Sequence, residues 1–158
     1  MSMMGKVVAV NRSEKKGVVK KPVETGFFQE EHGLEGDAHA GKWHRQVSLL
    51  GVESVDKMKK AGVTGLVNGS FAENITTEGI LLYQLPVGTI LKIGETIQEV
   101  SQIGKECHGA CDIKKQVGLC ITPREGIFTR VLKSGEVKAG DTIEVLKGED
   151  GLNYKLKF

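Results

Sequence analysis

Short apolar runs rich in β-branched residues recur along the chain and predict strands. In the first, residues 6–11, Val7, Val8 and Val10 stand between polar neighbours, and β-branched side chains favour extended backbone. The same pattern predicts strands at residues 17–23, 46–50, 90–93, 96–102, 128–132 and 142–146. Residues 148–158 alternate apolar and polar positions, which predicts either a final edge strand or a frayed tail.

One segment has the periodicity of a helix. Val52, Val55 and Met58 lie three residues apart, and Glu53 precedes Lys57 by four positions. This spacing predicts a helix over residues 52–61. Because the strands do not alternate regularly with helices, we predict a mainly β fold: a small, barrel-like, mostly antiparallel domain with one or two short helices.

Glycine and turn patterns fit that architecture. Residues 88–97 and 135–143 are similar stretches, in which Gly, an acidic residue and Thr-Ile open a strand. We interpret both as corners where a barrel reverses direction. Residues 24–43 lack apolar periodicity, and a loop of this length is usually functional or hides a short strand.

Composition narrows the class of protein. Apolar residues make up 39% of the chain and the net charge is +2, which indicates a globular domain and argues against a nucleic-acid-binding protein. No run of 18 apolar residues predicts a membrane span. With no signal peptide and an odd number of cysteines, 3, we expect reduced thiols and a cytoplasmic location.

All three cysteines fall in one segment that also carries a histidine: Cys107, His108, Cys111 and Cys120. Thiolate and imidazole suit zinc or another thiophilic metal, so one hypothesis is a structural zinc module without catalysis. A second is a reactive thiol, because nearby cations lower a thiol pKa. A third is that Cys111 and Cys120 are small buried apolar residues. The surrounding basic residues are Lys105, Lys114, Lys115 and Arg124.

Asp37 and His39 lie in a glycine-rich stretch, residues 33–41. In extended chain the two side chains would share a face, where a carboxylate fixes an imidazole tautomer, supports a metal ligand or forms an acid/base pair. The alternative is an Asx turn at Asp37 and a solvent-exposed His39.

Two further sets of residues are candidates for binding. Arg124 and Arg130 suit a bidentate grip on phosphate or carboxylate, unless they are ordinary turn and barrel-end residues. Asn74 follows Glu73 between apolar neighbours. The Glu-Asn pair either orients a ligand or satisfies buried backbone groups.

Taken together, these stretches resemble the MOSC domain, named for the C-terminal domain of molybdenum cofactor sulfurases. The matching segments run in order along the chain: residues 33–41, 45–50, 71–75, 102–107, 130–132, 135–137 and 140–141. The resemblance predicts a MOSC domain over residues 3–147. This chain differs from related sequences at Ala72, where they more often carry Gly, and at Leu119, where close relatives often carry Asp.

The resemblance implies a barrel-like domain that binds molybdenum cofactor or handles sulfur. Cys107 matches the family cysteine, which carries sulfur as a persulfide or ligates molybdenum. By the same comparison Asp37, His39 and Arg45 line the cleft near it, with catalytic roles for Asp37 and His39. We assign a cofactor-binding role to Arg45, Asn74, Lys105, Arg124 and Arg130, the last two from their charge.

Larger family members add a pyridoxal-phosphate desulfurase domain or an N-terminal β-barrel domain, and neither fits within 158 residues. We therefore expect a stand-alone member that needs partners: a cysteine desulfurase or other sulfur donor, and a cofactor acceptor or redox partner. A further alternative is a reductase of N-oxygenated compounds with bound molybdenum cofactor.

Overall fold

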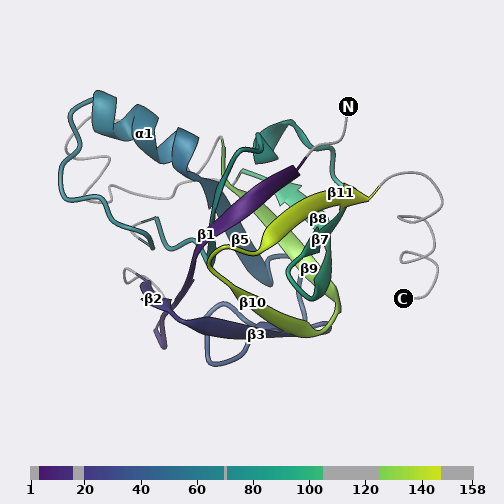
Figure 1. Cartoon of the computed structure of the whole chain (residues 1–158). Helices are drawn as coiled ribbons and strands as arrows, with labels where there is room; N and C mark the ends of the chain where they lie inside the picture. The colour runs from purple at the N-terminus through teal and green to yellow at the C-terminus, as the bar shows by residue number, and fades with distance from the viewer. Residues whose placement is uncertain (1–3, 16–19, 70, 105–124, 147–158) are drawn as a thin grey trace.

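The computed structural model describes residues 4–15, 20–69, 71–104 and 125–146 (Figure 1). Within these ranges no helix is both long and apolar enough to span a membrane. The helices are α1 (Val52–Lys60) and the short 3-10 turn η1 (Leu82–Gln84). The strands are β1 (Met4–Arg12), β2 (Lys21–Val23), β3 (Thr25–Gln29), β4 (Gly33–Leu34), β5 (Val47–Gly51), β6 (Ile75–Glu78), β7 (Ile90–Ile93), β8 (Thr96–Ile103), β9 (Ile127–Lys133), β10 (Gly135–Lys138) and β11 (Thr142–Leu146).

Seven strands close into a barrel. Their order is β11, β7, β8, β9, β5, β6, β1, and β1 then pairs with β11 to complete the ring (Figure 1). Gly5 of β1 lies opposite Ile143 of β11, which in turn lies opposite Ile93 of β7. Every pair in the ring is antiparallel except β5–β6. The mainly β, mostly antiparallel barrel predicted from the sequence is confirmed.

The parallel pair is a feature that the sequence did not predict. β5 and β6 run in the same direction, with Leu49 opposite Ile75, and α1 follows β5 in the connection between them, as a parallel pair requires. The position of α1, Val52–Lys60, confirms the helix predicted over residues 52–61. Its buried residues Val55 and Met58 pack with Leu50 of β5 and with Phe71, so β5 is covered on both faces.

A second, three-stranded sheet (β10, β3 and β4) lies below the barrel in Figure 1. β3 and β4 fall in residues 24–43, so that long stretch does hide short strands. Phe28 of β3, Leu34 of β4 and Val137 of β10 are buried in the same cluster as the barrel core. β6 and β10 were not predicted, and residues 17–23 form a strand only from Lys21 in the part that the structure describes.

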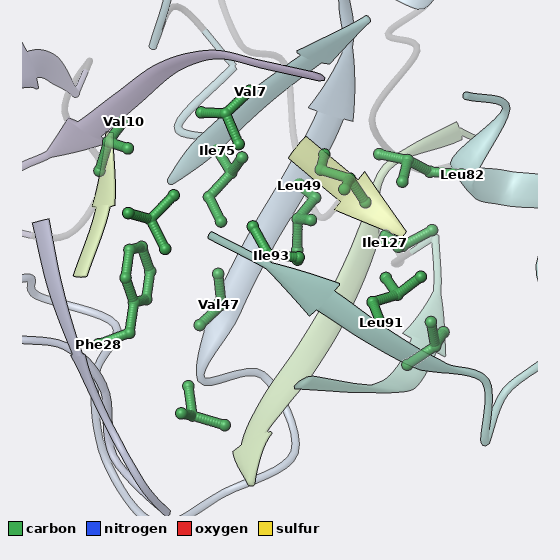
Figure 2. Packing of buried hydrophobic residues seen from close by; sticks show 14 of the residues in the cluster. Val7, Val10, Phe28, Val47, Leu49, Ile75, Leu82, Leu91, Ile93 and Ile127 are labelled. Carbon is green, nitrogen blue, oxygen red and sulfur yellow. The ribbon is translucent and has the colours of Figure 1, made fainter. Parts of the chain in front are cut away.

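The barrel core consists of apolar side chains that the strands direct inward. Figure 2 shows Val7 and Val10 of β1, Leu49 of β5, Ile75 of β6 and Ile93 of β7 directed toward one another. Each is buried, and full burial of such a side chain contributes about 1.5–3 kcal/mol. Burial of these side chains therefore contributes a large share of the stability of the barrel.

Glycines of the two similar stretches, residues 88–97 and 135–143, have two different structural roles. Gly94, with φ of +55°, and Gly140, with φ of +93°, lie in the turns before β8 and β11, as expected for barrel corners, because glycine adopts positive φ without steric cost. Gly135 was also interpreted as a corner, and it is separated by one residue from the end of β9, where the chain passes from the barrel to the second sheet, without a positive φ. It lies within β10, where a Cβ would come 2.7 Å from Cβ of Glu95, so close packing explains it.

Ala72 lies in the left-handed region, with φ of +61°, and replacing it with glycine should stabilise the protein. An L-residue in this region costs about 1–2 kcal/mol, of which the greater flexibility of unfolded glycine offsets about 0.5–1 kcal/mol. We expect Ala72→Gly to raise the free energy of unfolding by about 0.5–1 kcal/mol in urea titrations. Ala61→Gly is the control, because Ala61 has φ of −80°. Equal losses of stability in both variants would contradict the prediction.

Candidate functional site

A pocket of about 200 Å³ opens beside β5. Its walls come from the residues before and within β5, the segment before β6 and the beginning of β9. A mostly apolar pocket with a few polar groups is typical of small-molecule sites. The lining residues are His39, Trp43, Arg45, Ser48, Leu49, Leu50, Phe71, Ala72, Glu73, Gly126, Ile127 and Phe128.

The connection between β8 and β9 begins and ends at this pocket. The backbone N–H of Gly104 donates to the carbonyl of Gly126 at 2.6 Å, and Gly126 lines the pocket. Cys107 follows Gly104 by three residues, so the chain allows a separation of at most about 11 Å between them. Lys105, Cys107 and Arg124 themselves lie outside the described residues, as do His108, Cys111 and Cys120.

Asp37 is buried and paired with a lysine. Nζ of Lys20 lies 2.7 Å from Oδ1 of Asp37, and the two side chains are 0% and 1% exposed. Oδ1 also accepts the backbone N–H of Ser13 at 3.1 Å. Burial alone would raise the pKa of Asp37, but the hydrogen bonds from Lys20 and Ser13 and the charge of Lys20 outweigh it, so the pKa is lower than usual.

Lys20 also separates Asp37 from His39. Its Nζ lies 3.0 Å from Nδ1 of His39, whereas Oδ2 of Asp37 lies 3.8 Å from the same nitrogen. Oδ2 instead accepts the backbone N–H of His39 at 3.1 Å, which is the Asx turn weighed as the alternative. Of the two alternatives left open by the sequence, the Asx turn is present, and the carboxylate lies beside the imidazole at 3.8 Å without a hydrogen bond between them. His39 lines the pocket, and Asp37 lies behind it.

Arg45 presents donors to the pocket. Its Nε donates to Oε1 of Gln102 at 3.1 Å, and its guanidinium lies 5.4 Å from the ring centroid of Phe128. Gln102 in turn donates to the carbonyl of Gly104 at 2.7 Å. No hydrogen bond joins the terminal guanidinium nitrogens of Arg45 to any residue that the structure describes. They therefore offer a planar pair of donors suited to an anion.

Arg130 lies in a shallow groove next to the pocket, which it shares with Glu31, Lys42, Trp43 and His44. Trp43 lines both hollows. The Arg130 guanidinium pairs with the Glu31 carboxylate at a partly exposed position, where such pairs contribute little. Its predicted grip on a phosphate would have to displace or share this carboxylate.

Asn74 has its side chain fully engaged within the protein. Its Oδ1 accepts the backbone N–H of Ser48 at 3.0 Å, and its Nδ2 donates to the carbonyl of Asn11 at 3.2 Å. The residue is 0% exposed. The amide thereby ties β6 to β5 and β1, and this geometry gives no support to a contact with a ligand.

Glu73 organises the turn before β6. Its carboxylate accepts the backbone N–H groups of Gly69 at 3.2 Å and Phe71 at 3.1 Å, and the hydroxyl of Thr76 at 2.7 Å. Burial raises its pKa, with these hydrogen bonds acting in the opposite direction. The Glu-Asn pair thus satisfies buried backbone groups, which is the alternative considered from the sequence.

The raised pKa of Glu73 makes stability depend on pH. At pH values above 4.5, the ordinary pKa of this side chain, the folded protein holds the proton of the Glu73 carboxyl more tightly than the unfolded chain does. Stability from this group therefore falls as the pH rises from about 4.5 through the folded pKa. Glu73→Gln removes the ionisation, so the difference in free energy of unfolding between wild type and variant should shrink across that range. A difference that stays constant in urea titrations at successive pH values would contradict this.

The described residues suit the organic part of a flat, anionic cofactor better than they suit a metal. Arg45 supplies terminal N–H groups that no described residue accepts, and Trp43, Phe71 and Phe128 supply aromatic walls. Among the described residues, no group of three or more His, Cys, Asp or Glu side chains is placed to hold a metal ion. A thiolate ligand would have to come from Cys107, outside these ranges.

A comparison with known protein families shows to which family this chain belongs. A model described as the MOSC domain matches residues 36–144. The chain belongs to the MOSC domain family. The matched range holds the Asx turn at Asp37, the pocket and the β8–β9 connection, and it leaves out the first four strands, β1 to β4.

Individual relatives agree with this assignment. The uncharacterised protein YflK of Bacillus subtilis is 26% identical over 149 residues, covering 88% of this MOSC chain and 67% of its own. The YuaD structure from Bacillus subtilis superposes with a TM-score of 0.75 at 19% identity, covering 92% of this chain and 97% of that one. YiiM from Geobacillus stearothermophilus gives 0.69 at 20% identity, covering 90% and 75%. At these identities the two structures establish a shared fold.

Proposed function

We propose that this MOSC domain binds molybdenum cofactor and relays sulfur as a persulfide on Cys107. The observation that carries the proposal is the position of Arg45. Its terminal N–H groups, which make no hydrogen bond to a described residue, belong to a side chain that lines an apolar pocket next to the end of β8, from which the segment bearing Cys107 continues. Membership of the MOSC family supports the same chemistry, because the family takes its name from molybdenum cofactor sulfurases.

The sulfur relay needs a thiolate and a donor that is itself a persulfide. The Cys107 thiolate attacks the terminal sulfur of the donor, a new S–S bond forms, and the donor's S–S bond breaks. The donor thiolate leaves with the electron pair, and Cys107 keeps the sulfur as a persulfide. Transfer to an acceptor nucleophile reverses these bond changes and regenerates the thiolate, so the cycle needs no external oxidant.

The residues that would hold the cofactor follow from the pocket. Arg45 suits its anionic group, and Phe128 and Trp43 suit its flat ring system. When bound, the cofactor would supply a thiophilic molybdenum centre that a cysteine thiolate can ligate. Roles for Lys105, Arg124 and Arg130 in the same binding event are part of the proposal.

The proposal requires partner proteins. A cysteine desulfurase or another persulfide protein would load Cys107, and a cofactor acceptor or a redox partner would take the product. Neither the reductase nor the zinc hypothesis gains support from a described residue. The zinc module is one outcome of the experiment that follows.

The amount of molybdenum cofactor that the purified protein retains tests whether the domain binds it. In protein purified from its native host, we expect pterin fluorescence and molybdenum in the wild type and a loss of about tenfold or more in Arg45→Met, since a hydrogen-bonded charge is removed. Lys92→Met, at an exposed position on β7, is the control and should match the wild type. Stoichiometric zinc released only on unfolding, without pterin, would favour the zinc module.

A further inference from the structure

The groove beside the pocket contains an ion pair that engages the Arg130 guanidinium. Nη2 of Arg130 lies 2.5 Å from Oε1 of Glu31, and Nη1 lies 3.9 Å from Oε1 of Glu99. Both side chains of the Arg130–Glu31 pair are 36% exposed, and a pair at such a position contributes only about 0–1 kcal/mol to stability. Another anion can therefore replace Glu31 on Arg130 at little cost to the fold.

The backbone of Glu31 argues against a purely structural role for this pair. Its φ is +55°, a left-handed conformation that costs a non-glycine residue about 1–2 kcal/mol, at least as much as the pair contributes. The turn does not depend on the carboxylate, because the backbone N–H of Glu31 donates to the carbonyl of Val131 at 3.0 Å. The other carboxylate oxygen, Oε2, makes a long contact of 3.4 Å with Nε2 of Gln46. Strain of this kind beside a groove points to a functional residue.

The charges that line the groove favour an anion with more than one negative charge. Lys42 lines the groove together with Arg130, so a doubly charged group can contact two cations, whereas Glu31 brings a single charge. Because Glu99 remains beside Arg130, a singly charged carboxylate gains nothing over Glu31. A phosphate group carries about −1.5 to −2 charges near neutral pH and three acceptor oxygens, and a guanidinium binds two such oxygens side by side.

The groove and the pocket meet at Trp43, which lines both hollows. Phe128, in the wall of the pocket, and Arg130 are two residues apart on β9 and therefore face the same side of the strand. This spacing separates their Cα atoms by about 7 Å. A ligand whose flat part lies against Phe128 can therefore place a phosphate group on Arg130.

We infer that the Arg130 groove binds a phosphate group, and that Glu31 is an internal competitor that pairs with Arg130 until phosphate replaces it. Glu31 thereby weakens the binding of every anion to the groove, so that only a group with a strong interaction of its own binds there. That this phosphate belongs to the flat ligand of the pocket rests on the proposed function. The exchange at Arg130 stands on the geometry of the groove.

Equilibrium dialysis of the full chain against ³²P-labelled inorganic phosphate, at neutral pH and constant ionic strength, measures the exchange. We expect Glu31→Gln to bind phosphate about three- to fivefold more tightly than the wild type, since the competing pair contributes at most about 1 kcal/mol. Glu30→Gln removes a charge from the exposed neighbouring residue and should leave the affinity unchanged. If Glu31→Gln binds phosphate no more tightly than Glu30→Gln, Glu31 does not compete.

Substitution of the cation tests where the phosphate binds. We expect Arg130→Gln to bind phosphate about tenfold more weakly or worse, the effect of losing hydrogen bonds from a charged group. Lys133→Gln, at an exposed position of the same strand, should match the wild type. In the Arg130→Gln background, Glu31→Gln should have no further effect, because its competition acts through Arg130. An unchanged affinity in Arg130→Gln, or a full gain from Glu31→Gln in its background, would overturn the site.

Failure of the proposed function has a different signature. If protein from the native host holds no molybdenum cofactor but inorganic phosphate binds as described, the groove stands and the identity of the flat ligand is wrong. If the cofactor is retained and the phosphate affinity depends on neither Glu31 nor Arg130, the proposed function stands and the competition by Glu31 is refuted.

Discussion

Lys20→Met is expected to lower the free energy of unfolding by about 3–5 kcal/mol, the usual cost of removing one partner from a buried ion pair. The methionine fills a similar volume, but the Asp37 carboxylate then loses its cationic partner and keeps neutral donors, among them the backbone N–H groups of Ser13 and His39, in a site that is 1% exposed. For a domain of this size the loss corresponds to a fall in melting temperature of about 10 °C.

Two variants test the cause of that loss. Lys20→Met/Asp37→Asn removes both charges, so we expect it to recover about 2 kcal/mol relative to the single variant. Lys21→Met changes the exposed neighbouring lysine and should stay within about 0.5 kcal/mol of the wild type. If Lys20→Met is no less stable than Lys21→Met in urea titrations, the ion pair does not support the fold.

Cys107→Ser is expected to abolish persulfide formation, with a fall in rate of about a hundredfold or more, because a serine hydroxyl is not ionised near neutral pH and does not accept sulfur as a thiolate does. The measurement is the intact mass of the full chain after incubation with glutathione persulfide, where each transferred sulfur adds the mass of one sulfur atom.

The other two cysteines provide matched controls in the same segment. Cys111→Ser and Cys120→Ser each remove one thiol, and both should still gain one sulfur at Cys107. Persulfide formation that survives in Cys107→Ser and disappears in Cys111→Ser or Cys120→Ser would move the reactive position and overturn the assignment to Cys107.

The barrel was predictable because its core strands follow simple rules. Apolar runs rich in β-branched residues predicted β1, β5, β7, β8, β9 and β11, each within a few residues. β6 was missed because its sequence, Ile-Thr-Thr-Glu, has buried threonines that look solvent-exposed in sequence. The hydroxyl of Thr76 is buried because it bonds to Asn11 and Glu73, a partnership between distant positions that no local pattern shows.

The site was predictable in part. The Asp37–His39 stretch and Arg45 were identified from motifs, and the structure brings His39 and Arg45 to one pocket. Lys20 was missed because lysine is the residue least expected in a protein interior. Its place after Val18 and Val19 in an apolar run was a signal, but its partners are 7, 17 and 19 positions away. Such a network becomes visible only when the chain is folded.

Pairing of β1 with β11 has a consequence for how the chain is made. The ring closes when the first strand meets residues 142–146, so a ribosome must release nearly the whole domain before the barrel can form. Until then β1 and β7 each present an unpaired edge, and open strand edges promote association between chains. Nascent chains that stall after β10 should therefore tend to associate with one another. We expect them to bind chaperones that completed chains do not need.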